Sequence, residues 1–286
     1  MQSRRIGDTQ VSAVGLGAMP MSLEGRPDER QSIATIHAAL EAGVTLIDTA
    51  DAYSRDSSDI GHNESLIASA LASFGGDTSA VLVATKGGHT RTATGGWEVN
   101  GSPEYLKQAC EASLKRLGVD AIGLYQFHRP DPRVDYADSV GAIRDLLDAG
   151  KIRYAGISNA NPEQIKLSNE ILGGRLVSVQ NQFSPDFRSS EPELVLCAEL
   201  GIAFLPWSPF GGIRRAGELG SRFAPFAKIG ATHGVSAQQV CLAWMLAKAP
   251  VVIPIPGSSR PETIRDSAGA VHLTLSAEEL AELDAA

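Results

Sequence analysis

Residues 43–53 read GVTLIDTADAY and contain one complete strand-to-loop unit of the chain. Gly43 is placed to end a preceding helix, and residues 45–49 form the short apolar run typical of a buried strand. Asp48 closes that run and Tyr53 follows it in the loop. If the strand belongs to a barrel, polar side chains at its carboxyl end are candidates for function.

The alternation of strand and helix occurs eight times along the chain. Strands are expected at residues 14–19, 45–49, 81–86, 122–128, 154–159, 178–183, 203–208 and 251–256. Helices are expected near residues 30–43, 61–74, 103–117, 136–149, 161–172, 190–200, 235–248 and 261–269. Eight such units favour an α/β fold of the (β/α)8 TIM-barrel type over an open, doubly wound sheet.

Two segments lie outside this repeat. Residues 4–14 predict an N-terminal β-hairpin that turns at Gly7-Asp8, and residues 276–283 predict an extra C-terminal helix capped by Ser276 with Glu279. No linker-like stretch divides the chain, so residues 1–286 are expected to form a single domain. The long glycine-rich loops 87–101 and 211–224 are expected to carry function.

Composition restricts the class of partner. The formal net charge of −8 argues against sequence-independent binding to nucleic acid, which needs a basic surface. Cys110, Cys197 and Cys241 are widely spaced and predict buried thiols rather than a metal site. No segment reaches the roughly 20 apolar residues of a membrane span. A cytoplasmic protein with a small-molecule partner is therefore expected; the oligomeric state is left open.

Four ionisable residues are expected to meet at one end of the barrel. Asp48, Lys86 and His128 end three consecutive predicted strands, and Tyr53 follows Asp48 by five residues. Carbonyl reduction needs a proton donor at the oxygen, and Tyr53 suits that role if Lys86 lowers its pKa from about 10. Asp48 would keep Lys86 protonated, and His128 would orient the carbonyl. No metal is expected.

These residues lie in stretches that closely resemble the aldo-keto reductases: GVTLIDTADAY, ATKGG, LYQFHRPD and GKIRYAGISNA. The resemblance covers nearly the whole chain and places Asp48, Tyr53, Lys86 and His128 on the positions of the family's catalytic tetrad. It implies an oxidoreductase that reduces a small aldehyde or ketone with a hydride from NADPH bound across the barrel mouth.

The resemblance also implies a set of cofactor-binding residues. Ser158, Asn159 and Gln180 would hold the nicotinamide carboxamide, and Trp207 would stack on its ring. The remaining positions are Ser208, Phe210 and Gly211 at the pyrophosphate and Gly257, Ser258 and Arg260 at the adenosine phosphate. Asp266 and Ser267 depart from the family's usual Glu-Asn, which leaves NADH open as a second cofactor.

The same residues allow three other interpretations. A Rossmann fingerprint is incomplete because Pro20 replaces the third glycine after Gly15-Leu16-Gly17. A Schiff-base aldolase would use Lys86 as nucleophile, but Asp48 and Tyr53 suit reduction better. A slow or non-catalytic NADPH-binding sensor subunit with the same fold is the main alternative function.

The substrate pocket is expected at the two long loops. His89 and Trp97 are expected to line the substrate pocket, with Arg91 and Phe210 nearby, because the two long loops supply these residues. The stretches around His89, QFHRPDP and WSPFGG are faintly similar to the bacterial branch that includes pyridoxal reductases. That likeness suggests an aromatic aldehyde.

Overall fold

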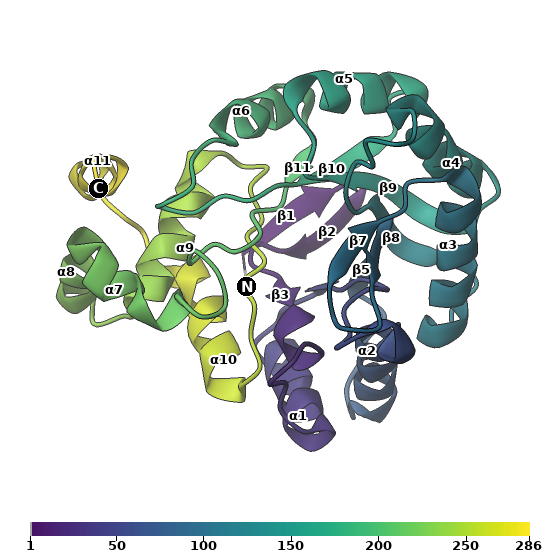
Figure 1. The fold of residues 1–286 in the computed structure, drawn as a ribbon. Helices are drawn as coiled ribbons and strands as arrows, with labels where there is room; N and C mark the ends of the chain where they lie inside the picture. The colour runs from purple at the N-terminus through teal and green to yellow at the C-terminus, as the bar shows by residue number, and fades with distance from the viewer. Residues whose placement is uncertain (1) are drawn as a thin grey trace.

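The computed structural model describes residues 2–286, and its centre is a curled parallel sheet surrounded by helices (Figure 1). The strands of this sheet, in spatial order, are β11 (Ala203–Phe204), β10 (Leu176–Gln180), β9 (Ile152–Ser158), β8 (Ile122–Phe127), β5 (Leu82–Gly87), β4 (Leu46–Asp48) and β3 (Leu16–Gly17). Each strand after β3 pairs in parallel with the strand before it in the barrel order. The fold is the predicted TIM barrel.

The eighth predicted strand, at residues 251–256, is not a regular strand. It nevertheless closes the barrel between β11 and β3 through parallel bridges from Phe204 to Val252 and from Gly17 to Gly257. Ile253 N donates to Phe204 O at 2.8 Å, whereas Pro254 and Pro256 have no backbone N–H to donate. The two prolines explain why this position is held by isolated bridges rather than by a ladder.

Helices cover the outside of the barrel close to the predicted positions. Their bounds are α1 (Glu29–Glu41), α2 (His62–Ser73), α3 (Pro103–Leu117), α4 (Tyr136–Asp148), α5 (Pro162–Ile171), α6 (Glu191–Leu200), α9 (Ala237–Lys248) and α10 (Pro261–Gly269). The predicted caps are present: Ser102 accepts a hydrogen bond from Tyr105 N, and Asn161 forms a capping box with Gln164.

The loop after β11 contains more helix than the sequence predicted. It holds α7 (Leu219–Arg222) and α8 (Ala224–His233), and α8 packs against α9 and against the C-terminal helix α11 (Ala277–Asp284). The short 3-10 turns are η1 (Met19–Met21), η2 (Ser57–Asp59), η3 (Ala216–Glu218) and η4 (Ala270–His272). The predicted capping box of Ser276 and Glu279 at the start of α11 is confirmed.

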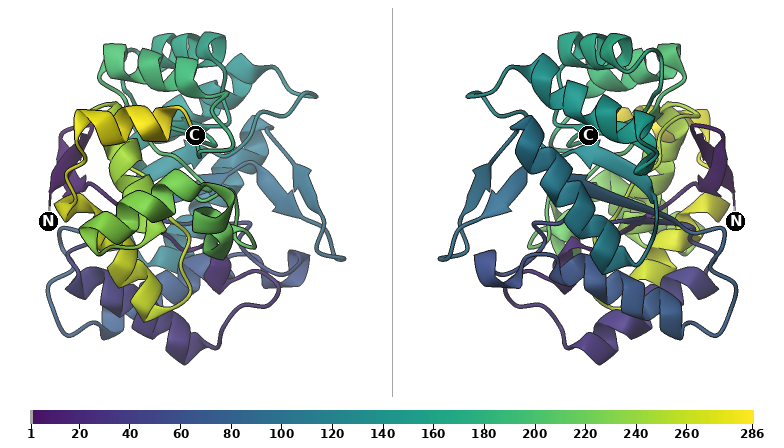
Figure 2. Two further views of the ribbon diagram at one scale, coloured as in Figure 1. Left: turned by 90° about the vertical axis from the view of Figure 1, so that its left-hand side faces the viewer. Right: turned by 90° about the vertical axis from the view of Figure 1, so that its right-hand side faces the viewer.

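Two hairpins lie at opposite ends of the barrel (Figure 2). The predicted N-terminal hairpin joins β1 (Ser3–Ile6) to β2 (Thr9–Ser12) and packs on Tyr154, near the start of β9. The second joins β6 (His89–Arg91) to β7 (Trp97–Val99) and stands over the carboxyl ends of the strands. The first hairpin therefore covers the bottom of the barrel and the second borders its functional end.

Apolar side chains fill the barrel and the layer between sheet and helices. Leu46, Leu124 and Ile253 belong to a buried cluster inside the sheet, while Trp244 packs with Phe183 under α9. The three cysteines are buried, as the sequence predicted. Within residues 2–286, none of the helices combines the length and hydropathy required to cross a membrane.

Candidate active site

The four ionisable residues predicted from the strand ends lie together at the carboxyl end of the barrel. Lys86 Nζ, at the end of β5, lies 2.7 Å from Asp48 Oδ1 and 3.2 Å from Tyr53 Oη. It also donates to the carbonyl oxygen of Thr49 at 2.7 Å. Because the Lys86 side chain is 0% exposed, all three of its ammonium hydrogens are used inside the protein.

Charge pairing keeps Lys86 protonated despite its burial. Burial lowers the pKa of Lys86, but the opposite charge of Asp48 and the contacts with Tyr53 together raise the pKa by more than burial lowers it. The net shift is therefore upward. Burial raises the pKa of Asp48, and the attraction of Lys86 opposes that shift. The 2.7 Å contact is therefore a buried ion pair.

Tyr53 differs from the sequence-based expectation in one respect. The sequence led us to expect that the Lys86 ammonium brings the phenol pKa below its usual value, but the net shift is upward. Burial of the 7% exposed side chain raises the pKa more than Lys86 lowers it. The phenol is consequently held in its protonated form, which is the form a proton donor requires.

His128 follows β8 and presents a neutral imidazole. Burial lowers its pKa well below the usual value, and the positive charge of Lys86 adds to that shift. Its ring lies edge-on to the Tyr53 ring, with centroids 5.8 Å apart. No residue from 2 to 286 hydrogen-bonds its Nδ1, which is buried. A neutral ring can donate one hydrogen bond and accept another.

A cavity of about 1080 Å³ opens beside these residues. It is lined by Asp48, Tyr53 and His128 and by most of the residues assigned to a dinucleotide from the sequence. Those residues are Ser158, Asn159, Gln180, Trp207, Ser208, Phe210, Gly257, Ser258 and Arg260. Gly17, Met19 and Pro20 also line it. The sequence places them at or just after the end of the first predicted strand but assigns them to no site, because their side chains carry no ionisable or amide group.

Ser158, Asn159 and Gln180 offer oxygen acceptors to the cavity. Asn159 Nδ2 donates to His128 O and to Ser158 Oγ, each at 3.0 Å, and Ser158 Oγ donates to Gln180 O. The Gln180 amide nitrogen donates to Asp48 Oδ2 at 2.7 Å. The carbonyl oxygens of both side-chain amides are left as acceptors, which suits a ligand with an N–H₂ group.

The loop after β11 brings the indole ring of Trp207 and a left-handed backbone position at Ser208 to the site. The buried Trp207 Nε1 has no hydrogen-bond partner within the described chain, and Ser208 has a left-handed φ of 51°. Phe210 is 7% exposed and lines the cavity. Gly211 does not line it: its N–H donates to Ser208 O at 2.9 Å, and its α-carbon faces the Asp186 carboxylate.

The segment after residue 256 borders the other side of the cavity. Ser258 Oγ donates to Arg260 O at 3.1 Å and contacts Thr263 in the first turn of α10. The Arg260 side chain is 61% exposed and lies 3.4 Å from Glu262. Both carboxylate oxygens of Asp266 accept hydrogen bonds, one from Ser236 at the N-cap of α9 and one from Gln239 within that helix. The side chain of Ser267 lines the cavity and forms no such bond within residues 2–286.

The β6–β7 hairpin forms a flat wall of the cavity. The His89 and Trp97 rings stack with centroids 4.6 Å apart, and both residues line the cavity. The Arg91 guanidinium lies 3.9 Å from the centroid of the Trp97 ring and donates to Arg55 O. Burial and the neighbouring cations lower the pKa of His89 to about 4, so this ring is neutral at ordinary pH.

A cluster behind the site was not predicted from the sequence. Asp51 is 2% exposed, and its Oδ2 accepts a hydrogen bond from Tyr105 on α3. Beside it, Glu64 on α2 accepts from Thr85 Oγ1 at 2.6 Å and pairs with Arg116 at 2.7 Å. Only the folded arrangement of α2, α3 and β5 brings these side chains together.

Comparison with known sequences gives a consistent relationship. The profile of the Aldo/keto reductase family matches residues 13–286. An uncharacterized oxidoreductase of Schizosaccharomyces pombe is 34% identical over 284 residues, a match that covers 98% of this chain and 88% of the yeast protein.

Solved structures resemble the whole barrel. The glycerol dehydrogenase AKR11B4 of Gluconobacter oxydans superimposes with a TM-score of 0.84 and 27% identity, covering 99% of this chain and 94% of that one. An aldo/keto reductase of Klebsiella pneumoniae, solved in complex with NADP and acetate, gives a TM-score of 0.82 and 25% identity over 99% and 94% of the two chains.

Proposed function

Because the chain belongs to the aldo/keto reductase family, we propose that it is an NADPH-dependent enzyme that reduces the carbonyl of a small aldehyde or ketone. The observation that carries this proposal is the position of Lys86 Nζ, 2.7 Å from Asp48 and 3.2 Å from Tyr53 Oη beside the large cavity. This arrangement supplies the proton that carbonyl reduction consumes.

Tyr53 is the proton donor in this proposal. Its phenol is held protonated by burial, and the adjacent Lys86 ammonium stabilises the phenolate that forms once the proton has left. The neutral His128 donates a hydrogen bond to the carbonyl oxygen and so orients the substrate. Asp48 acts through Lys86, because its charge keeps the ammonium protonated.

The cavity suits the family's dinucleotide. NADPH supplies the hydride when it is bound. The related Klebsiella pneumoniae protein was solved in complex with NADP, which supports NADPH as the cofactor. The free amide oxygens of Asn159 and Gln180 would accept from the nicotinamide carboxamide, with Ser158 beside them and Trp207 against the ring. Ser208 and Phe210 are proposed at the pyrophosphate, and Gly257, Ser258 and Arg260 at the adenosine phosphate. Gly211 is not included, because it does not line the cavity and its N–H already donates to Ser208 O.

The environment of Lys86 argues against Schiff-base chemistry. A lysine nucleophile must be neutral to attack a carbonyl carbon, whereas Asp48 and Tyr53 raise the pKa of Lys86 and hold it as a cation. All three ammonium hydrogens are engaged at distances of 2.7 to 3.2 Å. An aldolase is therefore the weaker interpretation of the same residues.

The test is NADPH oxidation, followed by loss of reduced-cofactor absorbance, with 4-nitrobenzaldehyde as substrate. Tyr53→Phe should lower kcat by about 10²- to 10⁴-fold and leave the NADPH dissociation constant unchanged, because it removes the acid and little volume. Tyr136→Phe, which removes a hydroxyl bonded to Ser168 far from the cavity, is the matched control.

Two outcomes would contradict the proposal. Full activity in Tyr53→Phe would show that another group donates the proton. Tight NADPH binding without turnover of any aldehyde or ketone would favour the sensor subunit instead.

A further inference from the structure

Arg129 is a cation in the cavity wall that has no anionic partner. It directly follows His128 and lines the same cavity as Tyr53 and His128. None of residues 2–286 forms an ion pair with its guanidinium or accepts a hydrogen bond from it, and its Nε is buried. A partly buried charge without a partner is costly, so this position suits a ligand that brings the opposite charge.

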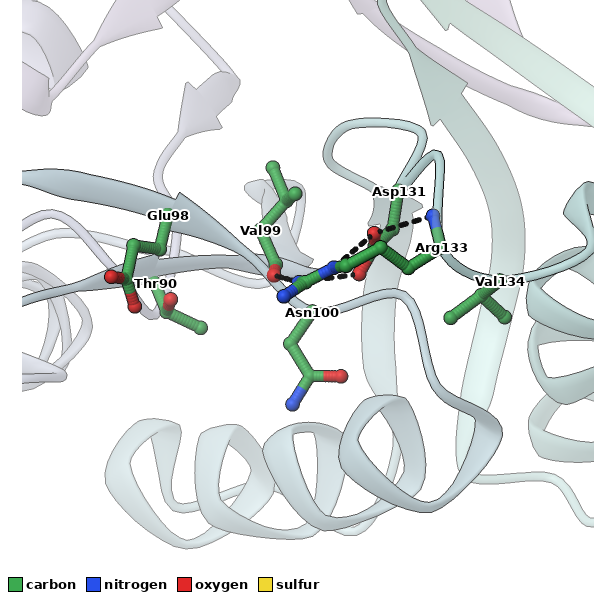
Figure 3. A pocket seen from close by; sticks show the side chains of 7 residues that line it. All are labelled: Thr90, Glu98, Val99, Asn100, Asp131, Arg133 and Val134. Atoms are coloured by element: carbon green, nitrogen blue, oxygen red, sulfur yellow. Dashed lines mark hydrogen bonds and ion pairs between the residues drawn. The ribbon is translucent and has the colours of Figure 1, made fainter.

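Two nearby arginines differ from Arg129 in their partners or in their position. Arg133 pairs with Asp131 at 2.9 Å and also donates to Val99 O, in a smaller side cavity of about 320 Å³ (Figure 3). Arg91 stacks on Trp97 and donates to Arg55 O. Its Nε and Nη1 are also buried without a hydrogen-bond partner among residues 2–286, but unlike Arg129 it does not line the main cavity. Asp131 and Val99 thus fix Arg133 but leave Arg129, four residues earlier, available to the main cavity.

Arg129 directly follows His128 in the chain and lines the same cavity as His128 and His89. After burial, which has the largest effect, Arg129 contributes to the lowered pKa values of both His128 and His89. The His89 and His128 rings are themselves in edge contact, with centroids 4.9 Å apart. The guanidinium therefore lies near the two imidazoles that border the proposed carbonyl position.

The barrel topology separates Arg129 from the residues proposed for the cofactor phosphates. Arg129 follows β8, the fourth strand position counted from β3, whereas Ser258 and Arg260 follow the closing segment at the eighth position. The fourth and eighth positions face each other across an eight-membered barrel. A phosphate held near Ser258 would therefore be on the opposite side of the mouth.

We infer that Arg129 binds a carboxylate on the substrate, so that the preferred substrates are aldehydes or ketones that carry one carboxylate group. This inference rests on the proposed function. A planar carboxylate matches the two parallel donors of a guanidinium. Glu98 also lines the cavity, and its negative charge disfavours a doubly charged phosphate there. The flat His89–Trp97 wall would pack against the carbon skeleton.

The experiment compares 4-carboxybenzaldehyde with its neutral methyl ester under identical NADPH-saturated conditions. The wild-type enzyme should show a kcat/KM for the acid at least about 10-fold above that for the ester. Arg129→Gln should lower kcat/KM for the acid about 10- to 100-fold, while the value for the ester changes less than about 3-fold. Arg129→Lys should retain part of the preference for the acid, because it keeps the positive charge but loses the two parallel N–H donors of the guanidinium.

Arg153→Gln is the matched control, because it removes an exposed arginine beside the N-terminal hairpin at the far end of the barrel. It should leave both kcat/KM values unchanged. Retained turnover of the neutral ester shows that Arg129→Gln is folded and active.

Four results separate the possible failures. If the wild-type enzyme reduces the ester but shows no preference for the acid, this inference fails and the proposed function stands. An equal loss for both substrates, or a raised KM for NADPH in Arg129→Gln, would also overturn it. A better rate with 4-formylphenyl phosphate than with the acid would overturn the choice of carboxylate. If neither aldehyde nor any other carbonyl compound is reduced, the proposed function itself fails.

Discussion

The side-chain amide of Gln180 donates a 2.7 Å hydrogen bond to Asp48 Oδ2 and so joins β10 to β4 across the mouth of the barrel. Asp48 Oδ1 is bound by Lys86 at the same distance. The buried carboxylate is thus held by a cation on one oxygen and an amide on the other. This second contact explains how a carboxylate that is 2% exposed is held beside the phenol of Tyr53.

Gln180→Leu should therefore destabilise the cofactor-free protein. The substitution removes a donor from a buried, charged acceptor, and we expect the free energy of unfolding to fall by about 1 to 3 kcal/mol. Equilibrium urea denaturation measures this loss. Gln10→Leu on the exposed face of β2 is the control and should change the value by less than about 0.5 kcal/mol. A loss no larger than that of the control would mean that the Asp48 contact contributes little.

Arg260 should discriminate between the two nicotinamide cofactors. Arg260→Gln should raise the KM for NADPH about 10-fold or more and leave the KM for NADH nearly unchanged, because only NADPH carries the 2′-phosphate. The control is Arg265→Gln on the same helix, whose side chain pairs with Glu41 at 2.9 Å. Equal wild-type KM values for NADPH and NADH would remove the case for Arg260 as the discriminating residue.

The strand-end residues could be predicted because their positions follow from a local pattern. A short apolar run fixes where a parallel strand ends, and Asp48, Lys86 and His128 each stand at such an end. Closure of the barrel by residues 251–256 was predicted as well. The absence of a regular strand there was not, because it depends on whether the neighbouring strands require the backbone N–H groups that Pro254 and Pro256 lack. Helix α8 was missed because it directly follows a glycine-rich loop.

Other features depend on contacts that local spacing does not encode. Nothing in the stretch around Arg129 shows that Asp131 pairs with Arg133 and that Arg129 has no partner among the described residues. The upward pKa shift of Tyr53 likewise depends on how completely the fold buries the phenol, which decides whether burial or Lys86 has the larger effect. The direction of such a pKa shift can be determined only once the structure shows how deeply the side chain is buried and which charges surround it.

Asp51 provides the last prediction, because its carboxyl group is buried without full pairing. Burial and the nearby negative charge of Glu64 raise its pKa from 3.8 to about 8. Its Oδ1 has no partner among residues 2–286, and Tyr105 Oη lies 3.3 Å from Oδ2. Arg116, whose charge acts to lower the pKa of Asp51, is already paired with Glu64. The folded protein therefore favours the protonated form of Asp51, whereas the unfolded chain ionises it near pH 4.

Between pH 4 and pH 8 the folded state binds more protons at Asp51 than the unfolded state, so the stability of the wild-type protein should fall as the pH rises through this range. Asp51→Asn replaces the acid with a neutral isostere and removes this dependence. We expect the variant to gain on the order of 2 kcal/mol relative to wild type between pH 6 and pH 8. Urea denaturation at several pH values measures the difference, with the exposed Asp120→Asn reporting the effect of removing one surface charge. A wild-type-to-variant difference that does not change with pH would show that Asp51 is ionised in the folded protein throughout, and that its burial is compensated by contacts other than those with Tyr105 and Arg116.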